Sequence, residues 1–137
     1  MNGEGTVERK LCAHCGRVVE PRRMRDADWA ALKYCSSACR RQAGARVHHR
    51  LEAAVVELLA ARPAGATICP SEAAREVFGE EFRAHMEDAR RAARRLSHRG
   101  VTVIRQRGRE VDAATFRGPI RIGRGPGFMA PARDTSP

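Results

Sequence analysis

The chain has 137 residues, five cysteines and a formal charge of +10 at pH 7. This length allows one ordinary domain, or a small metal-stabilised module joined to a domain of roughly 70 to 80 residues. No apolar run approaches the ~18 residues of a membrane span, and residues 1–10 lack the apolar core of a signal peptide, which disfavours the membrane and secreted classes. We therefore expect a cytoplasmic protein with no membrane partner, in which disulfides are disfavoured.

The positive charge indicates a polyanionic partner, and nucleic acid is the first candidate. The charge comes from 24 arginines and two lysines, Lys10 and Lys33. Coding bias is a rival explanation for a chain rich in arginine and alanine. Charge alone therefore does not decide the function.

The first ten residues are polar and predict a disordered lead-in. A four-cysteine zinc finger is predicted over residues 11–44, because two close thiolate pairs separated by a loop are typical of zinc modules. Gly16 permits the sharp turn of a zinc knuckle, and the second pair lies at the start of a predicted helix, whose N–H groups and dipole favour thiolates. The layout is treble-clef-like, with structural Zn²⁺ held by Cys12, Cys15, Cys35 and Cys39.

Four thiolate ligands leave no open coordination position, so the zinc should fold the module rather than perform chemistry. A redox dithiol or an iron–sulfur site is the alternative for these cysteines. Trp29, the only tryptophan, is expected to cover the metal core rather than stack on a base. His14 lies between two ligands and is expected to point away from the metal.

A second domain is predicted over residues 45–125. Its first helix is indicated by apolar residues at helical spacing from Val47 to Leu59, and it ends at Pro63. His48 and His49 on its opening turns are interpreted as surface residues.

The next helix begins at Pro70, which makes Cys69 its N-cap and Glu72 its N3 residue, in a capping box with sulfur in place of hydroxyl. A thiol at a helix N-terminus tends to have a lowered pKa, so Cys69 is also a candidate reactive thiol. No catalytic base is apparent near it in the sequence. A structural cap is the preferred interpretation.

An apolar seam from Phe82 to Leu96 predicts a third helix of about 18 residues that ends near Gly100. Nine arginines and only two carboxylates lie between Phe82 and Arg109, which is the pattern of a basic recognition helix followed by a basic hairpin. The alternative is that the hairpin arginines are ordinary solvated residues. The predicted nucleic-acid contacts are Arg90, Arg91, Arg94 and Arg95 on the helix, and Arg105, Arg107 and Arg109 on the hairpin.

Helix, short strand, helix, helix and hairpin, in that order, is the plan of a winged helix. Ile120 and Ile122 alternate with polar residues and predict one added edge strand. Residues 126–137 are rich in glycine and proline at their start and predict a disordered tail.

Two sets of segments resemble known bacterial sequences. CAHCGR, Trp29 and KYCSSACR resemble a short bacterial cysteine finger, and TICPSEAAR, RRLSHRGVTVIRQRGREVD and GPIRIGRG resemble a companion bacterial domain of unknown function with winged-helix character. The resemblance covers residues 11 to 125. It implies two domains, four cysteine ligands and a winged helix, but no established activity.

The predicted fold class is α+β, mainly α with small β hairpins, combining an N-terminal finger with a C-terminal winged helix. The leading hypothesis is a non-enzymatic, zinc-stabilised nucleic-acid-binding protein, specifically a DNA-binding regulator, with RNA as the less favoured ligand. A protein-interaction adaptor and a thiol redox sensor or enzyme using Cys69 are the alternatives. The sequence does not indicate an oligomeric state.

Overall fold

The computed structural model describes residues 9–21 and 23–131. Residues 1–8 of the predicted lead-in and residues 132–137 of the predicted tail lie outside the described residues. The fold is α+β, as predicted. In chain order its elements are α1 (Asp26–Ala31), α2 (Ser37–Gln42), α3 (Arg46–Ala60), β1 (Thr67–Ile68), α4 (Pro70–Phe78), the 3₁₀ helix η1 (Gly79–His85), α5 (Met86–His98), β2 (Thr102–Gln106), β3 (Arg109–Val111) and β4 (Arg121–Arg124).

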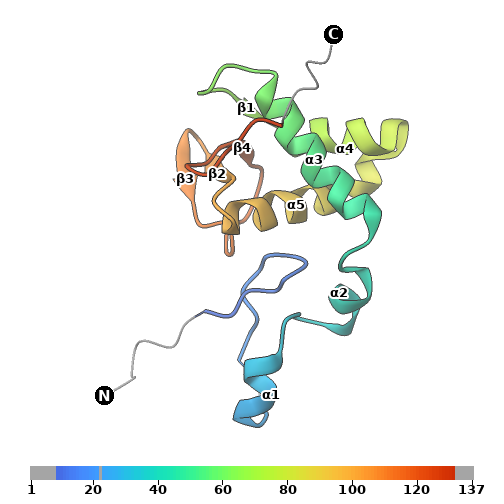
Figure 1. The fold of residues 1–137 in the computed structure, drawn as a ribbon, viewed down its shortest axis with the longest axis vertical. Coiled ribbons are helices and arrows are strands. Elements are labelled where there is room, and N and C mark those ends of the chain that lie inside the picture. Colours follow the sequence, from blue (N-terminus) through green and yellow to red (C-terminus); the bar gives the residue numbers. More distant parts are fainter. Residues whose placement is uncertain (1–8, 22, 132–137) are drawn as a thin grey trace.

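Two parts of the chain meet along α5. Residues 9–44, here called the finger segment, carry α1 and α2, and residues 45–131, the helix–sheet segment, carry the remaining elements. The loops of the finger segment approach α5 from the side opposite α3 and α4, while the sheet lies at one end of the helices (Figure 1). This placement makes α5 an internal element.

The helices α3 and α4 form as the sequence predicts. Leu51, Val55 and Leu59 on one face of α3 are fully buried, which is the apolar stripe that the periodicity indicates. At the start of α4 the backbone N–H of Cys69 donates to Glu72 Oε2 over 2.8 Å, and the Cys69 sulfur completes the reciprocal capping box.

The helix predicted from Phe82 begins later in the structure. The α conformation starts only at Met86, and the preceding turns are the 3₁₀ helix η1. His85, the last residue of η1 and the N-cap of α5, has φ −120° and ψ 18°, and its ring stacks on Phe78 at 3.5 Å between centroids. The apolar residues from Phe82 onward therefore lie on a 3₁₀ helix followed by an α-helix, rather than on the single helix that their spacing predicts.

The four strands form one antiparallel sheet in the order β1-β4-β2-β3. The prediction that β4 lies at an edge of the sheet is wrong, because β4 lies between β1 and β2. Ile122 pairs with Ile68 on one side and Ile104 on the other, and all three are buried. The element order α3, β1, α4, α5, β2, β3 is the one predicted, and the winged-helix assignment remains a prediction.

The main core joins α3, α5 and the sheet. Its fully buried members include Val55, Leu59, Ile68 and Ile104. Residues 126–131, predicted to belong to the tail, follow the sheet: the Gly127 N–H donates to the Gly100 carbonyl over 2.7 Å. Phe128 packs against the main core, so apolar contact extends to this part of the chain.

Glu52 links α3 to α5 through two arginines. Its Oε2 accepts from Arg95 Nε over 2.6 Å, and its Oε1 accepts from Arg99 Nη2 over 2.9 Å. Burial raises the pKa of Glu52, but the hydrogen bonds and charges of Arg95 and Arg99 outweigh it, so the pKa lies below 4.5. A depressed pKa means that the carboxylate stabilises the fold above pH ~4.5 and that this contribution is lost as the pH falls through the folded-state pKa.

Replacing Glu52 with glutamine should lower the free energy of unfolding by about 2 kcal/mol at pH 7, because the buried Arg95 guanidinium loses its counter-charge. Urea unfolding at pH 7 and near pH 4 measures the effect, and the gap between variant and wild type should narrow at the lower pH. Glu57→Gln is the control, since Glu57 is an exposed acid on the same helix. Equal effects of the two substitutions would contradict the proposed role of the Glu52 pair.

Candidate functional site

The first cysteine pair sits in a tight knuckle. The Gly16 N–H donates to the Cys12 carbonyl over 3.0 Å, and the Cys15 N–H points at Cys12 Sγ over 3.4 Å. Gly16 has φ +79°, a conformation that residues with a Cβ rarely adopt. The turn brings Cys12 and Cys15 together, as the spacing predicts.

The second pair is positioned by α2. Ser36 is the N-cap, and its Oγ accepts from the Cys39 N–H over 3.1 Å. Cys39 therefore lies in the first turn of the helix, while Cys35 immediately precedes the cap. The sequence predicts a knuckle followed by a pair of cysteines on the first turn of a helix. The structure has this arrangement for Cys39, whereas Cys35 precedes the N-cap and is not helical.

The sulfur separations fit a single metal ion. The four Sγ atoms all lie within 4.8 Å of one another, with 3.8 Å between Cys15 and Cys35 and 3.6 Å between Cys35 and Cys39. A tetrahedral site with zinc–sulfur bonds of about 2.3 Å has sulfur–sulfur edges of about 3.8 Å. Cys12, Cys15, Cys35 and Cys39 are thus positioned to bind a metal ion. Within residues 9–21 and 23–131, no other cluster of three or more His, Cys, Asp or Glu ligand atoms gathers as closely.

The thiols differ in how readily they ionise. Burial raises the pKa of Cys12, but hydrogen bonds from the backbone N–H groups of Cys15, Cys35 and His14 lower it by more. The pKa of Cys12 therefore falls from 9.0 to about 7. Burial raises the pKa of Cys15 to about 12 and also raises that of Cys39. Cys12 therefore ionises before Cys15 and Cys39, and a metal must displace protons from those two thiols.

Apolar side chains enclose the cysteine cluster. Trp29, Leu32 and Tyr34 pack against it, and the Lys10 ammonium lies 5.2 Å from the centroid of the Trp29 ring. The predicted cover over the metal core is therefore present. Trp29 is partly buried and belongs to this small core.

Two histidines meet where the finger segment contacts α3. The rings of His14 and His48 pack edge to face with centroids 4.5 Å apart, and the two residues are 1 % and 7 % exposed. The prediction that His48 is a surface residue is wrong, because its ring packs against His14 of the knuckle, which is distant in sequence. His49 is exposed, as predicted. His14 is not part of the cysteine cluster.

The knuckle backbone is bound by α5. Arg95 Nη1 donates to the His14 carbonyl over 2.5 Å, and Arg94 Nη1 donates to the Cys15 carbonyl over 3.1 Å. His98 Nε2 donates to the Gly16 carbonyl over 2.8 Å. Three consecutive carbonyl groups of the knuckle are thus held by one helix. These contacts dock the finger segment on the helix–sheet segment.

Arg94 is the centre of this docking surface. Its side chain is fully buried, Nη1 also donates to Glu87 Oε2 over 2.9 Å, and its guanidinium lies 4.9 Å from the Phe116 ring centroid. Arg17 lies over the same ring at 4.5 Å and donates to the Phe116 carbonyl over 2.6 Å. A Cβ on Gly16 would lie 2.4 Å from the Arg94 Cβ, so only glycine fits at the contact.

Burial and ion pairing account for the four arginines that the sequence places on a recognition helix. Arg94 and Arg95 face the finger segment, with 0 % and 11 % of their side chains exposed, so they cannot reach a nucleic acid in this conformation. Arg90 pairs with Glu87, and Arg91 pairs with Asp88 over 3.2 Å. These four arginines differ from the predicted DNA contacts because α5 packs against other parts of the protein. Their guanidinium groups therefore bind partners within the protein.

The three hairpin arginines lie in the β2–β3 hairpin. Arg107 and Gly108 form its two-residue turn, both with positive φ, as in a type I′ turn. Arg107 and Arg109 are exposed. Arg105 is half-buried and lies opposite Glu110 on β3 and Arg121 on β4. The structure therefore places Arg107 and Arg109 in contact with solvent, close to one another.

A further group of arginines, which sequence reasoning missed, flanks the turn between α2 and α3. No acidic residue occurs from residue 29 to residue 51. The structure exposes every arginine of this stretch, along the side of the molecule where α2 leads into α3 (Figure 1). The sequence signal for this group is the lack of any acidic residue over these 23 positions. It was overlooked because arginines are denser after residue 82. We call this group the connector surface: Arg40, Arg41, Arg46 and Arg50.

Cys69 lies apart from the metal cluster, at the start of α4. Its Sγ accepts from Ser71 Oγ over 3.1 Å, in addition to its part in the capping box. Its side chain is half-buried. The predicted N-cap role is confirmed, and a reactive role for this thiol remains a prediction.

No helix within the described ranges is both long enough and apolar enough to cross a membrane.

A comparison with curated proteins gives no match to the chain. Comparison with protein families matches residues 4–42 to one described as "Uncharacterized protein conserved in bacteria (DUF2256)". It also matches residues 48–125, more than half of the chain, to a second family. The chain therefore belongs to the family described as "Protein of unknown function (DUF3253)", and its finger segment is matched by the bacterial family DUF2256.

Proposed function

We propose that this protein is a zinc-stabilised, nucleic-acid-binding protein that performs no catalysis. Zinc is the proposed ion because soft thiolate ligands in a tetrahedral arrangement favour it over harder cations. Four thiolates would fill its coordination sphere, so the role of the metal is to fold the finger segment. Those ligands are Cys12, Cys15, Cys35 and Cys39.

The observation that carries the nucleic-acid proposal is the connector surface. Its four arginines are exposed, and no carboxylate side chain occurs from residue 29 to residue 51 of the sequence. Arg46 and Arg50 stand four positions apart on α3 and therefore share one face of that helix. Exposed guanidinium groups in such an arrangement match the phosphates of a nucleic acid, which bind arginine through paired hydrogen bonds.

The exposed hairpin arginines, Arg107 and Arg109, are a second proposed contact. The sequence also favours a DNA-binding regulator that inserts α5 into a groove. The burial of Arg94 and Arg95 removes the support for that geometry. The proposal therefore rests on the connector surface and the hairpin, and α5 acts as the scaffold between them and the finger segment.

Replacing Arg41, Arg46 and Arg50 together by alanine should weaken binding to nucleic acid of any sequence. Each lost phosphate contact reduces the slope of log K against log salt by about 0.7 to 0.9, so the triple variant should reduce it by about two to three. Fluorescence anisotropy with labelled DNA and RNA over a series of salt concentrations, using the zinc-loaded chain, measures both affinity and slope.

The control removes the same charge elsewhere. Arg75, Arg83 and Arg117 are exposed and lie outside both proposed contact surfaces, so their triple alanine variant should retain most of the affinity and the slope. Equal losses in the two triple variants would assign binding to overall charge rather than to the connector surface. Absence of binding by the wild-type protein at low salt, or binding that salt does not weaken, would contradict the proposed function.

A further inference from the structure

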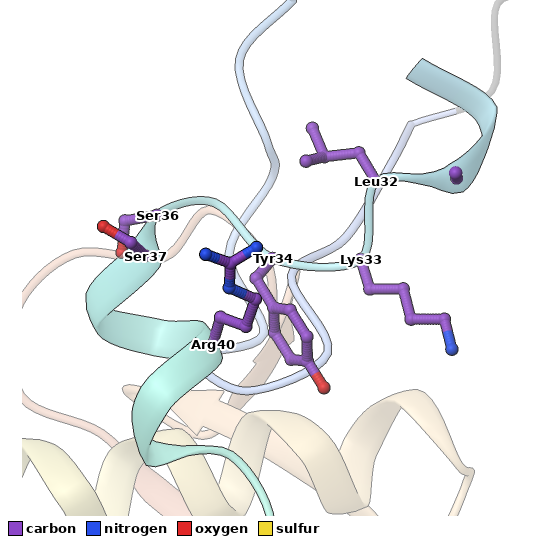
Figure 2. A pocket seen from close by; sticks show the side chains of 7 residues that line it. Leu32, Lys33, Tyr34, Ser36, Ser37 and Arg40 are labelled. Atoms are coloured by element: carbon purple, nitrogen blue, oxygen red, sulfur yellow. The ribbon is translucent and has the colours of Figure 1, made fainter. Parts of the chain in front are cut away.

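The finger segment contains a pocket that the metal site does not use. It has a volume of about 340 Å³ and lies between the end of α1 and the first turns of α2. Its lining includes Leu32, Lys33, Tyr34, Ser36 and Arg40. Figure 2 shows the Arg40 guanidinium between the Tyr34 ring and the two serines at the start of α2. The Lys33 side chain points away from Arg40. The pocket therefore combines an aromatic ring with a cationic wall.

The Tyr34 ring is held in place by the metal core. It is half-buried and packs against the cysteine cluster, and Cys35 follows it directly in the chain. Tyr34 thus packs against the cysteine cluster and also lines the pocket. A ring fixed in this way loses little conformational freedom when a planar group stacks on it.

The charges of the pocket continue into the connector surface. Lys33 and Arg40 are exposed lining residues, and Arg40 is followed by Arg41 on α2 and by Arg46 and Arg50 on α3. No acidic residue interrupts this stretch of chain. A ligand with a base in the pocket can therefore carry its following phosphates along the connector surface.

The combination favours a single strand over a duplex. Bases of a duplex are stacked inside it and cannot stack on an aromatic ring that lines a pocket without unpairing, whereas unpaired bases are free to stack. Next to the pocket, reading a duplex would require an exposed helix to enter a groove. The short helix α2 has six residues, and α5 is covered by the finger segment.

We infer that the Tyr34 pocket binds a base of single-stranded nucleic acid, stacked on the Tyr34 ring, with Arg40 and Lys33 contacting the adjacent phosphates. This inference rests on the proposed function and specifies its ligand. The ring supplies affinity without base identity, because every base presents a π face. Binding is thereby sequence-tolerant and sensitive to salt.

The test measures binding by the full-length, zinc-loaded protein. The probes are fluorescent oligothymidine and oligouridine about 12 nucleotides long, and a DNA duplex of the same length. Tyr34→Leu should weaken single-strand binding about tenfold, the size expected for loss of one base–aromatic stack, and Tyr34→Phe should retain it. Arg40→Gln should weaken it severalfold and should lower the salt slope by about one.

Two measurements show that the variants still fold. Zinc content reports the metal site, and Trp29 emission reports the apolar core around it, because Trp29 is the only tryptophan. Arg40 is exposed, so Arg40→Gln keeps the test decisive even where Tyr34→Leu loosens the finger segment. Arg83→Gln, an equal charge change on η1, is the matched control and should bind as the wild type does.

The outcomes separate the inference from the proposed function. Tighter binding of either single strand than of the duplex, lost in Tyr34→Leu and Arg40→Gln, supports the inference. Wild-type affinity in both variants overturns it while leaving nucleic-acid binding through the rest of the connector surface intact. A duplex that binds as tightly as the single strands also overturns it. A wild-type protein that binds none of the probes overturns the inference and the proposed function together.

Discussion

Replacing Cys39 with serine is expected to unfold the finger segment and to leave the helix–sheet segment folded. The apparent free energy of zinc binding to small cysteine modules is about 10 to 16 kcal/mol, which is comparable with or larger than the stability of a small domain. The buried residues of the finger core are three cysteines of the candidate metal site and Val19, so we expect a bound metal ion to be its principal support. The buried clusters of the helix–sheet segment contain no finger residue.

Trp29 makes the two responses separable. Its emission should shift to longer wavelength in Cys39→Ser, or after chelation of zinc, because it packs against the cysteine cluster. Far-UV circular dichroism should retain most of its helical signal, which comes from α3, α4 and α5. Cys69→Ser is the control: it changes the one cysteine outside the cluster to another good N-cap residue and should alter neither signal. A simultaneous collapse of both signals in Cys39→Ser would show that the two segments fold as one unit.

The second large effect is expected for Gly16→Ala, which should lower the free energy of unfolding by about 3 kcal/mol. Part of this cost, about 1 to 2 kcal/mol, arises because alanine disfavours the positive φ of this position. The rest is steric, because the new Cβ would lie 2.4 Å from the Arg94 Cβ, an atom that cannot move without shifting α5. The finger segment must then separate from α5 or distort its own knuckle.

Gly44→Ala separates these two contributions. Gly44 has φ +80°, nearly the same as Gly16, but a Cβ there would meet nothing within 4 Å. Its alanine variant should cost only the backbone contribution, about 1 kcal/mol. Urea unfolding followed by Trp29 emission and by circular dichroism measures both variants. If Gly16→Ala and Gly44→Ala were equally destabilising, close packing against Arg94 would be ruled out as the reason for glycine in the knuckle.

Local signals predicted much of this fold. The spacing of the four cysteines, the position of Gly16 and the capping box of Cys69 and Glu72 depend on residues close in sequence, and the structure contains each of them. The β2–β3 hairpin is similar, since Gly108 supplies the left-handed backbone that its turn requires. These features are predictable because their physical cause lies within a few residues.

The environment of α5 was not predictable in the same way. The sequence presents Arg94 and Arg95 as surface cations, and their burial depends on carbonyl acceptors about 80 positions away, in a knuckle whose orientation only the tertiary fold defines. Backbone acceptors leave no trace in side-chain composition. The central position of β4 was missed for a related reason, because alternation of Ile120 and Ile122 indicates a strand but not which strands flank it.

The docking of the knuckle on α5 has a consequence for the choice of metal. Helix α5 binds the carbonyl groups of His14, Cys15 and Gly16, so the contact depends on the path of the backbone rather than on the side chain at position 14. A larger thiophilic ion such as Cd²⁺ forms longer bonds to sulfur and would widen the loop that carries these carbonyls. The strain would reach Arg94 on α5, because its Nη1 donates to the carbonyl of Cys15, 79 positions earlier in the chain. We therefore expect the radius of the bound ion to affect how closely the knuckle packs against α5, although α5 itself contributes no ligand to the ion.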